Sequence, residues 1–308
     1  MYLEGITICV NYSDFLAWTL PAAKHQFDRL VVVTSTTDLA TQRLCEFHQV
    51  ECVATDVFYE NGARFNKAKG INAGLARLSK KGWVLHFDSD IYLPPLFRST
   101  LHPLNLDPHY LYGFDRLMCN SFADWFAFWQ APDHLQENGI YVHAHNTRFA
   151  IGTRVAHYGH PDGYVPIGFG QLWNVPASGI DHYPDEHQDA GRSDMLFAKC
   201  WARNRRSFVP EVLTIHLESE KLTTMGANWS GRTTRIFGPD PTTDPTTALA
   251  VPVAPPVLEA GYHEPTRDAP GASPAGSSTE GIMAAGLMAV GTIALGTLLA
   301  WGLYLLFA

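Results

Sequence analysis

The sequence predicts an α/β fold, with a mostly parallel sheet flanked by helices. Through residues 5–95, short runs rich in β-branched residues alternate with longer segments of helical spacing. Strand–helix units of this length join neighbouring parallel strands through crossover helices. Hydrophobic residues make up 46% of the chain and charged residues 17%, which supplies enough apolar surface for a buried core.

The elements follow in order from these patterns. Strands are predicted at residues 5–12, 29–35, 50–58 and 83–87, and helices at residues 14–27, 36–48 and 65–82. Thr36, Thr37 and Asp38 are typical of a helix start, and Gly82 with the lysines before it is typical of a helix end. In sheets of this kind, ligands bind beyond the carboxyl ends of the strands.

The C-terminal part of the chain divides into two zones. A globular domain is predicted over residues 1–237, followed by a Pro-, Thr- and Ala-rich disordered linker over 238–279. Residues 281–308 carry no charged side chain, so a single transmembrane helix is predicted over 280–308. Because the N-terminus lacks a basic and apolar leader pattern, we expect a tail anchor that leaves the catalytic domain in the cytoplasm.

Charge and cysteine usage exclude several classes of protein. The net charge is −8, so nucleic acid is not the default partner. The five cysteines form no CxxC pair, which argues against a disulfide framework or structural zinc and favours a reducing compartment. A separate zinc site remains open, because the fourteen histidines include three close pairs at positions 143/145, 157/160 and 182/187, although no HExxH pattern occurs.

The sharpest motif is Asp88-Ser89-Asp90, which directly follows the apolar run Trp83–Phe87. Both carboxylates should therefore emerge at the carboxyl end of a buried strand. A divalent ion, Mn²⁺ or Mg²⁺, held by Asp88 and Asp90 would reverse the local charge and attract a diphosphate. The alternative is a pair of acidic residues that only caps a turn.

The run FNKAKGINAGLARL followed by WVLHFDSDIYLPP resembles the nucleotide-sugar half of GT-A glycosyltransferases, especially the family 2 type. The resemblance covers roughly residues 5–220. It implies a GT-A (Rossmann-like) sheet, a metal at Asp88 and Asp90, and a UDP- or GDP-sugar donor. By the same resemblance, Asn11 and Asp38 lie near the nucleoside, and Lys67 and Asn72 lie near the diphosphate or ribose. Helix capping by Asp38 and an ordinary surface position for Lys67 are the alternatives.

The second half of the chain supplies the catalytic side of the resemblance. Gly191–Phe197 resembles the acidic motif that opens a helix in inverting GT-A enzymes, which implies that Asp194 deprotonates the acceptor hydroxyl. This chain has Ser193 before Asp194 where the family usually has Glu. Asp189, Asp185 and Glu186 are reserve candidates. His216, in the strand-like run VLTIHLES, would complete the metal shell by the same resemblance, and imidazole suits Mn²⁺ better than Mg²⁺.

Three other features have open interpretations. The aromatic run from Phe122 to Trp129 either stacks on sugar faces or belongs to the core. The loop 168–173 is expected to shape the acceptor pocket. The stretch MGANWSGRTTRIF could close over the diphosphate, with Arg232 stabilising the leaving group, or could be a structural extension.

The predicted function is therefore a metal-dependent glycosyltransferase of the hexosyltransferase type, and the resemblance around Asp194 implies inversion. Its acceptor could be a glycan, a lipid-linked sugar, a protein or a modified nucleic acid, and the apolar tail tilts the choice toward a lipid-linked acceptor. A nucleotidyltransferase is one alternative, but the segment after the first strand, NYSDFLAW, lacks the Gly-rich phosphate loop of that class. A non-catalytic, membrane-tethered module that binds nucleotide-sugars is the other.

Overall fold

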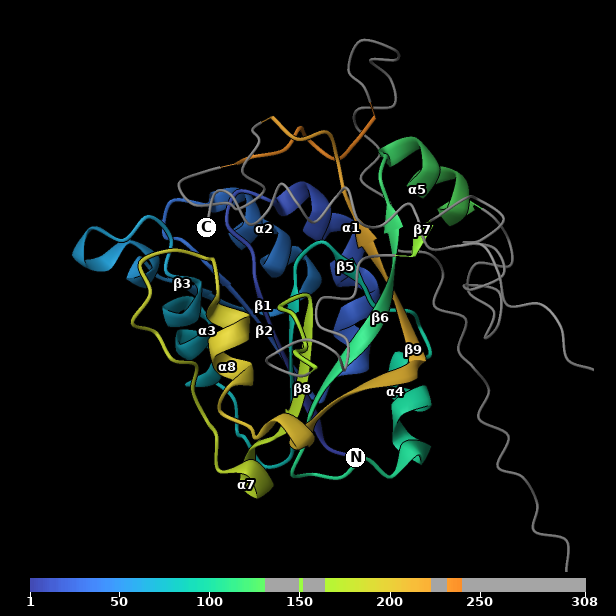
Figure 1. Cartoon of the computed structure of the whole chain (residues 1–308). Helices are drawn as coiled ribbons and strands as arrows, with labels where there is room; N and C mark the ends of the chain where they lie inside the picture. Colours follow the sequence, from blue (N-terminus) through green and yellow to red (C-terminus); the bar gives the residue numbers. More distant parts are fainter. Residues whose placement is uncertain (131–149, 152–163, 223–231, 240–308) are drawn as a thin grey trace, which may run out of the picture. The chain divides into compact units, whose positions relative to one another are not determined.

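The computed structural model describes residues 1–130, 150–151, 164–222 and 232–239 (Figure 1). These residues belong to the first of two compact units, Met1–Val257, and the second unit, Leu258–Ala308, lies outside the described residues. Nearly all of the predicted linker and the whole predicted span over 280–308 therefore also lie outside them. Within the described ranges, no helix has both the length and the hydropathy needed to cross a bilayer.

The described strands form one sheet with the order β3-β2-β1-β4-β8-β6-β9-β5, and β7 pairs with β6 beside this path. Their bounds are β1 Leu3–Ile8, β2 Arg29–Thr34, β3 Glu51–Ala54, β4 Trp83–Asp88, β5 Ile91–Tyr92, β6 Leu111–Cys119, β7 Ala150–Ile151, β8 Gly170–Asn174 and β9 Arg206–Leu217.

The described α-helices are α1 Ser13–Ala23, α2 Leu39–His48, α3 Lys67–Leu75, α4 Phe97–Leu101, α5 Phe122–Gln130, α7 Val175–Ser178 and α8 Ser193–Ala198. Short 3₁₀ turns lie at η1 Lys24–Gln26, η2 Val57–Gly62, η3 His102–Leu104 and η4 Arg203–Arg205.

The first half of the sheet is parallel, as the sequence predicts. β1 pairs in parallel with β2 on one side and with β4 on the other, and β2 pairs in parallel with β3. The second half corrects the prediction of a mostly parallel sheet. β8 is antiparallel to both β4 and β6, and β5 is antiparallel to β9, while β6 and β9 are parallel. Parallel neighbours need a crossover connection, usually a helix, between consecutive strands. After β4 strands and helices no longer alternate regularly, so the sheet is mixed.

Successive side chains along each strand point to opposite faces of the sheet, so the core has two layers, one on each face. Leu3, Val32 and Leu85 pack with residues of α1 and α2 on one face. Ile6 and Val33 pack with residues of α3 and α8 on the other. Helices therefore cover both faces, which confirms that part of the prediction (Figure 1).

The aromatic run at residues 122–129 belongs largely to a third core cluster. Trp125 and Phe128 are fully buried, and Trp125 packs edge-on against Tyr92. Trp18 of α1 contacts Trp125 as well. Core packing, and not sugar stacking, is therefore the structural role of these two side chains, while Phe126 is 39% exposed.

The helix predicted over residues 65–82 is shorter in the structure, where α3 ends at Leu75. The buried carboxylate of Glu4 accepts hydrogen bonds from the backbone N–H groups of Ser79 and Lys80, at 2.8 and 2.7 Å. Lys80 is in the left-handed region, with φ of 55°. A turn built around Glu4 thus replaces the last helical turns, and this long-range contact has no local sequence signal.

Gly74 permits the close approach of α3 to the sheet. A Cβ atom at this position would lie 2.2 Å from Ile6 Cδ1 and 2.7 Å from Val33 Cγ2. We therefore expect Gly74→Ala to lower the free energy of unfolding by about 1–3 kcal/mol through overpacking, although alanine has the better helix propensity. Chemical denaturation measures this change. A stabilised Gly74→Ala variant would show that α3 can move away from the sheet without cost.

The topology creates a switch point between β1 and β4. From β1 the chain proceeds through α1 to β2 and then to β3 on one side, and it returns through α3 to β4 on the other side. The crossover helices α1 and α3 therefore pack on opposite faces of the sheet. A crevice opens at such a point, and ligands of α/β proteins bind there.

Candidate active site

A cavity of about 340 Å³ lies beyond the carboxyl ends of β1 and β4. This volume is in the range of small-molecule sites. Its lining combines charged and polar side chains with apolar and aromatic ones. The lining residues are Ile8, Val10, Tyr12, Phe15, Phe65, Lys67, Asp88, Ser89, Asp90, Ala190, His216, Leu217, Glu218, Ser219, Lys221, Thr233 and Thr234.

Asp88 and Lys67 form an ion pair in this cavity. Asp88 ends β4 and Lys67 begins α3, and the Lys67 ammonium lies 2.5 Å from Asp88 Oδ1. Burial alone would lower the pKa of Lys67, but the carboxylates of Asp88, Asp194 and Asp90 outweigh it and raise that pKa. Burial raises the pKa of Asp88, and the nearby Lys67 opposes this shift. Lys67 therefore stays protonated and neutralises part of the negative charge of Asp88, Asp90 and Asp194.

Asp90 and His216 are brought together by strand pairing between distant parts of the chain. β5, which begins just after Asp90, pairs with β9 so that Ile91 faces His216, and Leu217 N donates to Asp90 O at 2.9 Å. His216 Nε2 lies 3.2 Å from Asp90 Oδ2. Burial would raise the pKa of Asp90, but His216 and then Lys67 more than offset it, so the pKa falls below its usual 3.8.

Arg116 of β6 is a site residue that the sequence reasoning missed. Its Nη1 donates to His216 Nδ1 at 2.6 Å, and its guanidinium lies 4.5 Å from the centroid of the Phe169 ring. Because an arginine can only donate, this hydrogen bond leaves the proton of a neutral His216 on Nε2, toward Asp90. Because side chains alternate along a strand, Arg116 points to the same side of β6 as the core residues Tyr112 and Phe114. A charged residue at a position where this alternation predicts a core side chain was the sequence signal for a site residue.

The residues at this point fit a divalent metal, although they are not arranged around one. In the described part of the chain, no group of three His, Cys, Asp or Glu side chains has a metal-binding arrangement. Asp90 Oδ1 is buried and has no hydrogen-bond partner among the described residues, and the side chain of Asp88 is 31% exposed. Two carboxylates and an imidazole are a donor set suited to Mn²⁺. Binding requires Lys67 to leave Asp88 and Arg116 to leave Nδ1 of His216.

Asp194 lies in the first turn of α8 and does not line the cavity. Its Oδ2 accepts a hydrogen bond from Gly168 N at 2.9 Å. A Cβ atom on Gly168 would lie 3.5 Å from Lys67 Nζ and 3.6 Å from Asp194 Oδ2. Gly168 therefore lies between the two charged groups. Residues 170–173 of the predicted loop 168–173 belong to strand β8, and the expected role of this stretch in an acceptor pocket stays a prediction.

Asn72 joins α3 to the loop that precedes α8. Its side chain accepts from Tyr183 N at 2.7 Å and donates to Tyr183 O at 2.9 Å. In the same way, Asn66 donates to Asp185 O at 2.8 Å. These bonds hold α8 and Asp194 next to α3 and Lys67. Asn72 does not line the cavity, so its predicted contact with the diphosphate or ribose stays a prediction.

Asp38 is the N-cap of α2, the alternative that the sequence left open. It is 5% exposed and accepts hydrogen bonds from Thr41 N at 3.1 Å and from Asn11 N at 2.7 Å. The second bond fixes the loop after β1, where Asn11 has a positive φ of 62°. Neither Asp38 nor Asn11 lines the cavity. Their predicted proximity to the nucleoside is therefore indirect in this structure, through the loop that leads to Tyr12.

Arg232 has partners other than the predicted diphosphate. It forms an ion pair with Asp14 of α1 at 2.5 Å and does not line the cavity, whereas its neighbours Thr233 and Thr234 do. In this structure Arg232 makes a structural contact beside the cavity, and its predicted role at the leaving group stays a prediction. The rest of the predicted flap, 223–231, lies outside the described residues.

The other sequence expectations have partial answers. All five cysteines are free thiols. The histidines at positions 143, 145, 157 and 160 lie outside the described residues, and His182 is a surface residue 2.9 Å from Asp181.

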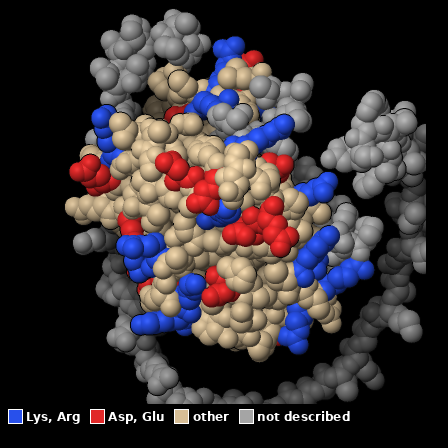
Figure 2. All heavy atoms as spheres, turned by 90° about the vertical axis from the view of Figure 1, so that its left-hand side faces the viewer, with Lys and Arg blue, Asp and Glu red and all other residues tan. Residues whose placement is uncertain are grey.

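On the face shown in Figure 2, acidic side chains gather near the middle and basic ones lie mostly around them. That face offers no continuous basic surface among its described residues.

Lys67 competes with a cation for Asp88, which gives a test of the site without a nucleotide. We expect Lys67→Met to lower the free energy of unfolding by about 1–3 kcal/mol, because a partly buried carboxylate loses its partner. We also expect Mn²⁺ to raise the melting temperature more in this variant than in the wild type, as measured by scanning fluorimetry. Lys69→Met is the matched control, since Lys69 pairs with Glu60 outside the cavity. Equal Mn²⁺ shifts in all three proteins would contradict the assignment.

No protein-family model and no curated protein sequence matches this chain. Solved structures similar to it include glucosyl-3-phosphoglycerate synthase from Mycobacterium tuberculosis in complex with Mn²⁺, uridine diphosphate and phosphoglyceric acid. That match has 13% identity, covers 70% of each chain and has a TM-score of 0.41. The same enzyme in complex with Mn²⁺, UDP-glucose and phosphoglyceric acid matches with 14% identity, a TM-score of 0.38 and coverage of 70% of this chain and 71% of that one. At this degree of similarity a function does not transfer, and the site's own residues decide the assignment.

Proposed function

We propose that this protein is a metal-dependent glycosyltransferase that moves a sugar from a nucleoside-diphospho-sugar to an acceptor hydroxyl. The supporting observation is the arrangement of Asp88 and Asp90 in a cavity at the switch point of the sheet. Each carboxylate is paired with a cationic or imidazole side chain, and one buried carboxylate oxygen has no partner within the described ranges. A divalent counter-ion would supply a cation for the carboxylates, and the diphosphate would supply an anion for Lys67.

Asp88, Asp90 and His216 are the residues that would hold the metal, Mn²⁺ or Mg²⁺. When bound, the ion would offset the negative charge of the diphosphate leaving group. Lys67, once released from Asp88, is a point charge within reach of the same phosphates. Its raised pKa keeps the ammonium protonated at neutral pH.

Two kinds of lining residue suit the two halves of the donor. Ile8, Val10, Phe65 and the ring of Tyr12 supply apolar and aromatic surface, which suits a nucleobase. Lys67, Asp88 and Asp90 supply the charged groups, which suit the diphosphate. We propose a UDP- or GDP-sugar as the donor.

Asp194 is the proposed general base for the acceptor hydroxyl, with inversion at the anomeric carbon. The Gly168 N–H group holds one of its carboxylate oxygens, which orients the side chain near Lys67. A hydroxyl that attacks the anomeric carbon must lose its proton, and a carboxylate placed at the acceptor side can accept it.

Two alternatives make different products. A nucleotidyltransferase would release pyrophosphate from a nucleoside triphosphate and a sugar phosphate, but the loop 9–12 between β1 and α1 contains no glycine to cradle a phosphate. A non-catalytic module would bind the donor and release nothing. Incubating the full-length chain with UDP- and GDP-sugars, Mn²⁺ and a panel of acceptors tests for transfer and for binding without turnover. A parallel incubation with UTP or GTP, Mn²⁺ and sugar 1-phosphates tests for pyrophosphate release. We expect Mn²⁺-dependent release of a nucleoside diphosphate, and pyrophosphate release or binding without turnover would contradict the proposal.

We further propose that residues 280–308 anchor the enzyme in a membrane with the catalytic domain in the cytoplasm, where a lipid-linked acceptor would be within reach. The uncharged sequence of residues 281–308 supports this proposal. Protease digestion of sealed membranes is the test. Digestion of residues 1–237 from the cytoplasmic side is expected, and protection of that domain would contradict it.

A further inference from the structure

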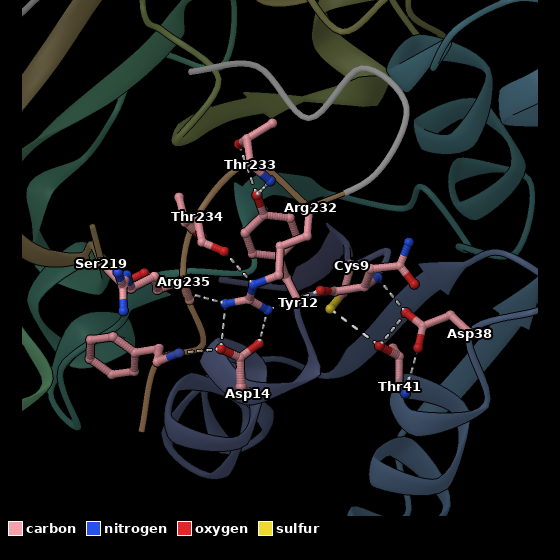
Figure 3. A network of polar contacts seen from close by, with 12 residues as sticks. Cys9, Tyr12, Asp14, Asp38, Thr41, Ser219, Arg232, Thr233, Thr234 and Arg235 are labelled. Carbon is pink, nitrogen blue, oxygen red and sulfur yellow. Dashed lines mark hydrogen bonds and ion pairs between the residues drawn. The ribbon is translucent and has the colours of Figure 1, made fainter. Parts of the chain in front are cut away.

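Asp14, in the first turn of α1, anchors a segment from the other end of the described chain (Figure 3). Its Oδ1 and Oδ2 accept hydrogen bonds from Nη1 and Nη2 of Arg232, at 2.5 and 2.6 Å. Oδ2 also accepts from Phe237 N at 2.5 Å. The side chains of Arg232 and Asp14 are only 20% and 18% exposed, so water screens this two-pronged ion pair weakly.

The Arg232 guanidinium uses its remaining donors on backbone carbonyls. Nη1 donates to Asn11 O at 3.1 Å, Nε to Thr234 O at 2.7 Å and Nη2 to Arg235 O at 2.6 Å. The group also lies 4.8 Å from the centroid of the Tyr12 ring. A single side chain thus joins residues 232–237, here named the strap, to the loop that follows β1.

The strap forms part of the wall of the cavity. Thr233 and Thr234 line it together with Tyr12 and Phe15. Tyr12 Oη accepts from Thr233 N at 3.1 Å, and it lies 3.1 Å from Thr233 Oγ1. Phe237 stacks on Phe15 with ring centroids 4.7 Å apart. The buried hydroxyl of Thr234 has no hydrogen-bond partner in the part of the chain that the structure describes.

The chemistry of this wall differs from that of the charged lining residues. Lys221, which also lines the cavity, pairs through its backbone with Thr234 of the strap. Tyr12, Thr233 and Thr234 themselves contribute an aromatic ring and two hydroxyl groups to the lining. Such groups suit a nucleobase and ribose hydroxyls, whereas Lys67, Asp88 and Asp90 suit phosphates. The two kinds of lining residue should therefore respond differently to changes in the strap.

We propose that Asp14 and Arg232 are positioning residues for the nucleoside half of the donor, acting through the strap and Tyr12 without touching the ligand. This inference rests on the proposed function. Removing either side chain leaves the charge of the other without its partner in a poorly hydrated place. The strap is then no longer held against the loop that follows β1. Ligand binding must then order the strap again, which lowers affinity for any ligand that uses the wall. Pyrophosphate, which needs only the charged lining residues, should be unaffected.

The experiment compares binding of UDP, GDP and pyrophosphate, each with Mn²⁺, to the full-length chain by calorimetry. For Asp14→Asn and Arg232→Gln we expect affinity for the nucleoside diphosphate to fall about 10- to 100-fold, and pyrophosphate affinity to stay at the wild-type value. The double variant should be no weaker than the weaker single variant, because both changes break one unit. Arg235→Gln is the matched control, since Arg235 lies in the same strap and pairs with Glu220 at the surface.

Several results would overturn the inference. Unchanged nucleotide affinity in Arg232→Gln, with binding still lost in Asp90→Asn, would refute the strap's role and leave the proposed function intact. Equal losses of nucleotide and pyrophosphate would show that the strap supports the whole site, and not the nucleoside half of the donor alone. No binding of either nucleotide to the wild type would remove both proposals. If Arg232→Gln unfolds, Arg232→Lys keeps the charge without the paired donors and is expected to show the same selective loss.

Discussion

Asp90→Asn is expected to abolish Mn²⁺-dependent binding of a nucleoside diphosphate, weakening it by at least about 100-fold. The amide keeps the volume of the side chain but removes the charge that a metal requires. Since His216 and Lys67 hold the pKa of Asp90 below 3.8, the wild-type carboxylate is fully ionised at neutral pH and available to a cation. Calorimetric titration of the variant with UDP and GDP in the presence of Mn²⁺ measures the loss.

Asp181→Asn is the control for this experiment, because Asp181 is a surface carboxylate 57% exposed beside His182. It should bind nucleotide as the wild type does. If Asp90→Asn binds nucleotide with wild-type affinity and an unchanged metal requirement, Asp90 is not a metal ligand, and its partnerless oxygen would be a feature of the turn before β5.

Asp194→Asn is expected to lower kcat for glycosyl transfer by about 100- to 10,000-fold, with nucleotide affinity unchanged. The residue lies next to Gly168, and it is not among the cavity's lining residues. An amide at this position can still accept the hydrogen bond from Gly168 N but cannot remove a proton. Steady-state kinetics and nucleotide titration on the same preparation separate the two effects.

The controls for Asp194 are the neighbouring acids. Asp189 accepts a hydrogen bond from Gly191 N, and Asp185 lies beside Asn72. We expect Asp189→Asn and Asp185→Asn to retain most of the turnover. If one of these variants loses turnover while Asp194→Asn keeps it, the residue changed in that variant, and not Asp194, is the general base. A product of retained configuration would instead remove the base from the mechanism.

Local patterns in the sequence were enough for the first half of the fold. The buried runs that became β1, β2 and β4 are each continuous in sequence, and the position of Asp88 at the carboxyl end of β4 follows directly from the run before it. The capping role of Asp38 was likewise visible, because a cap bonds to residues only a few positions away.

Contacts between distant residues could not be predicted in this way. The approach of His216 to Asp90 depends on the pairing of β5 with β9, and a short strand such as β5 carries no register signal of its own. Arg232 and Asp14 are 218 positions apart, so the sequence offered a diphosphate as the partner of Arg232 where the fold supplies a carboxylate. The early end of α3 has the same origin, since Glu4 comes from another strand.

The most direct test of the proposed donor site is calorimetric binding of UDP and GDP to the full-length wild-type chain, with Mn²⁺ and with a chelator. We expect one of the two nucleotides to bind in the presence of Mn²⁺ and to lose most of its affinity when the metal is removed. Binding of equal strength without metal, or no binding of either nucleotide under any divalent metal, would contradict a metal-dependent nucleotide-sugar site at Asp88 and Asp90.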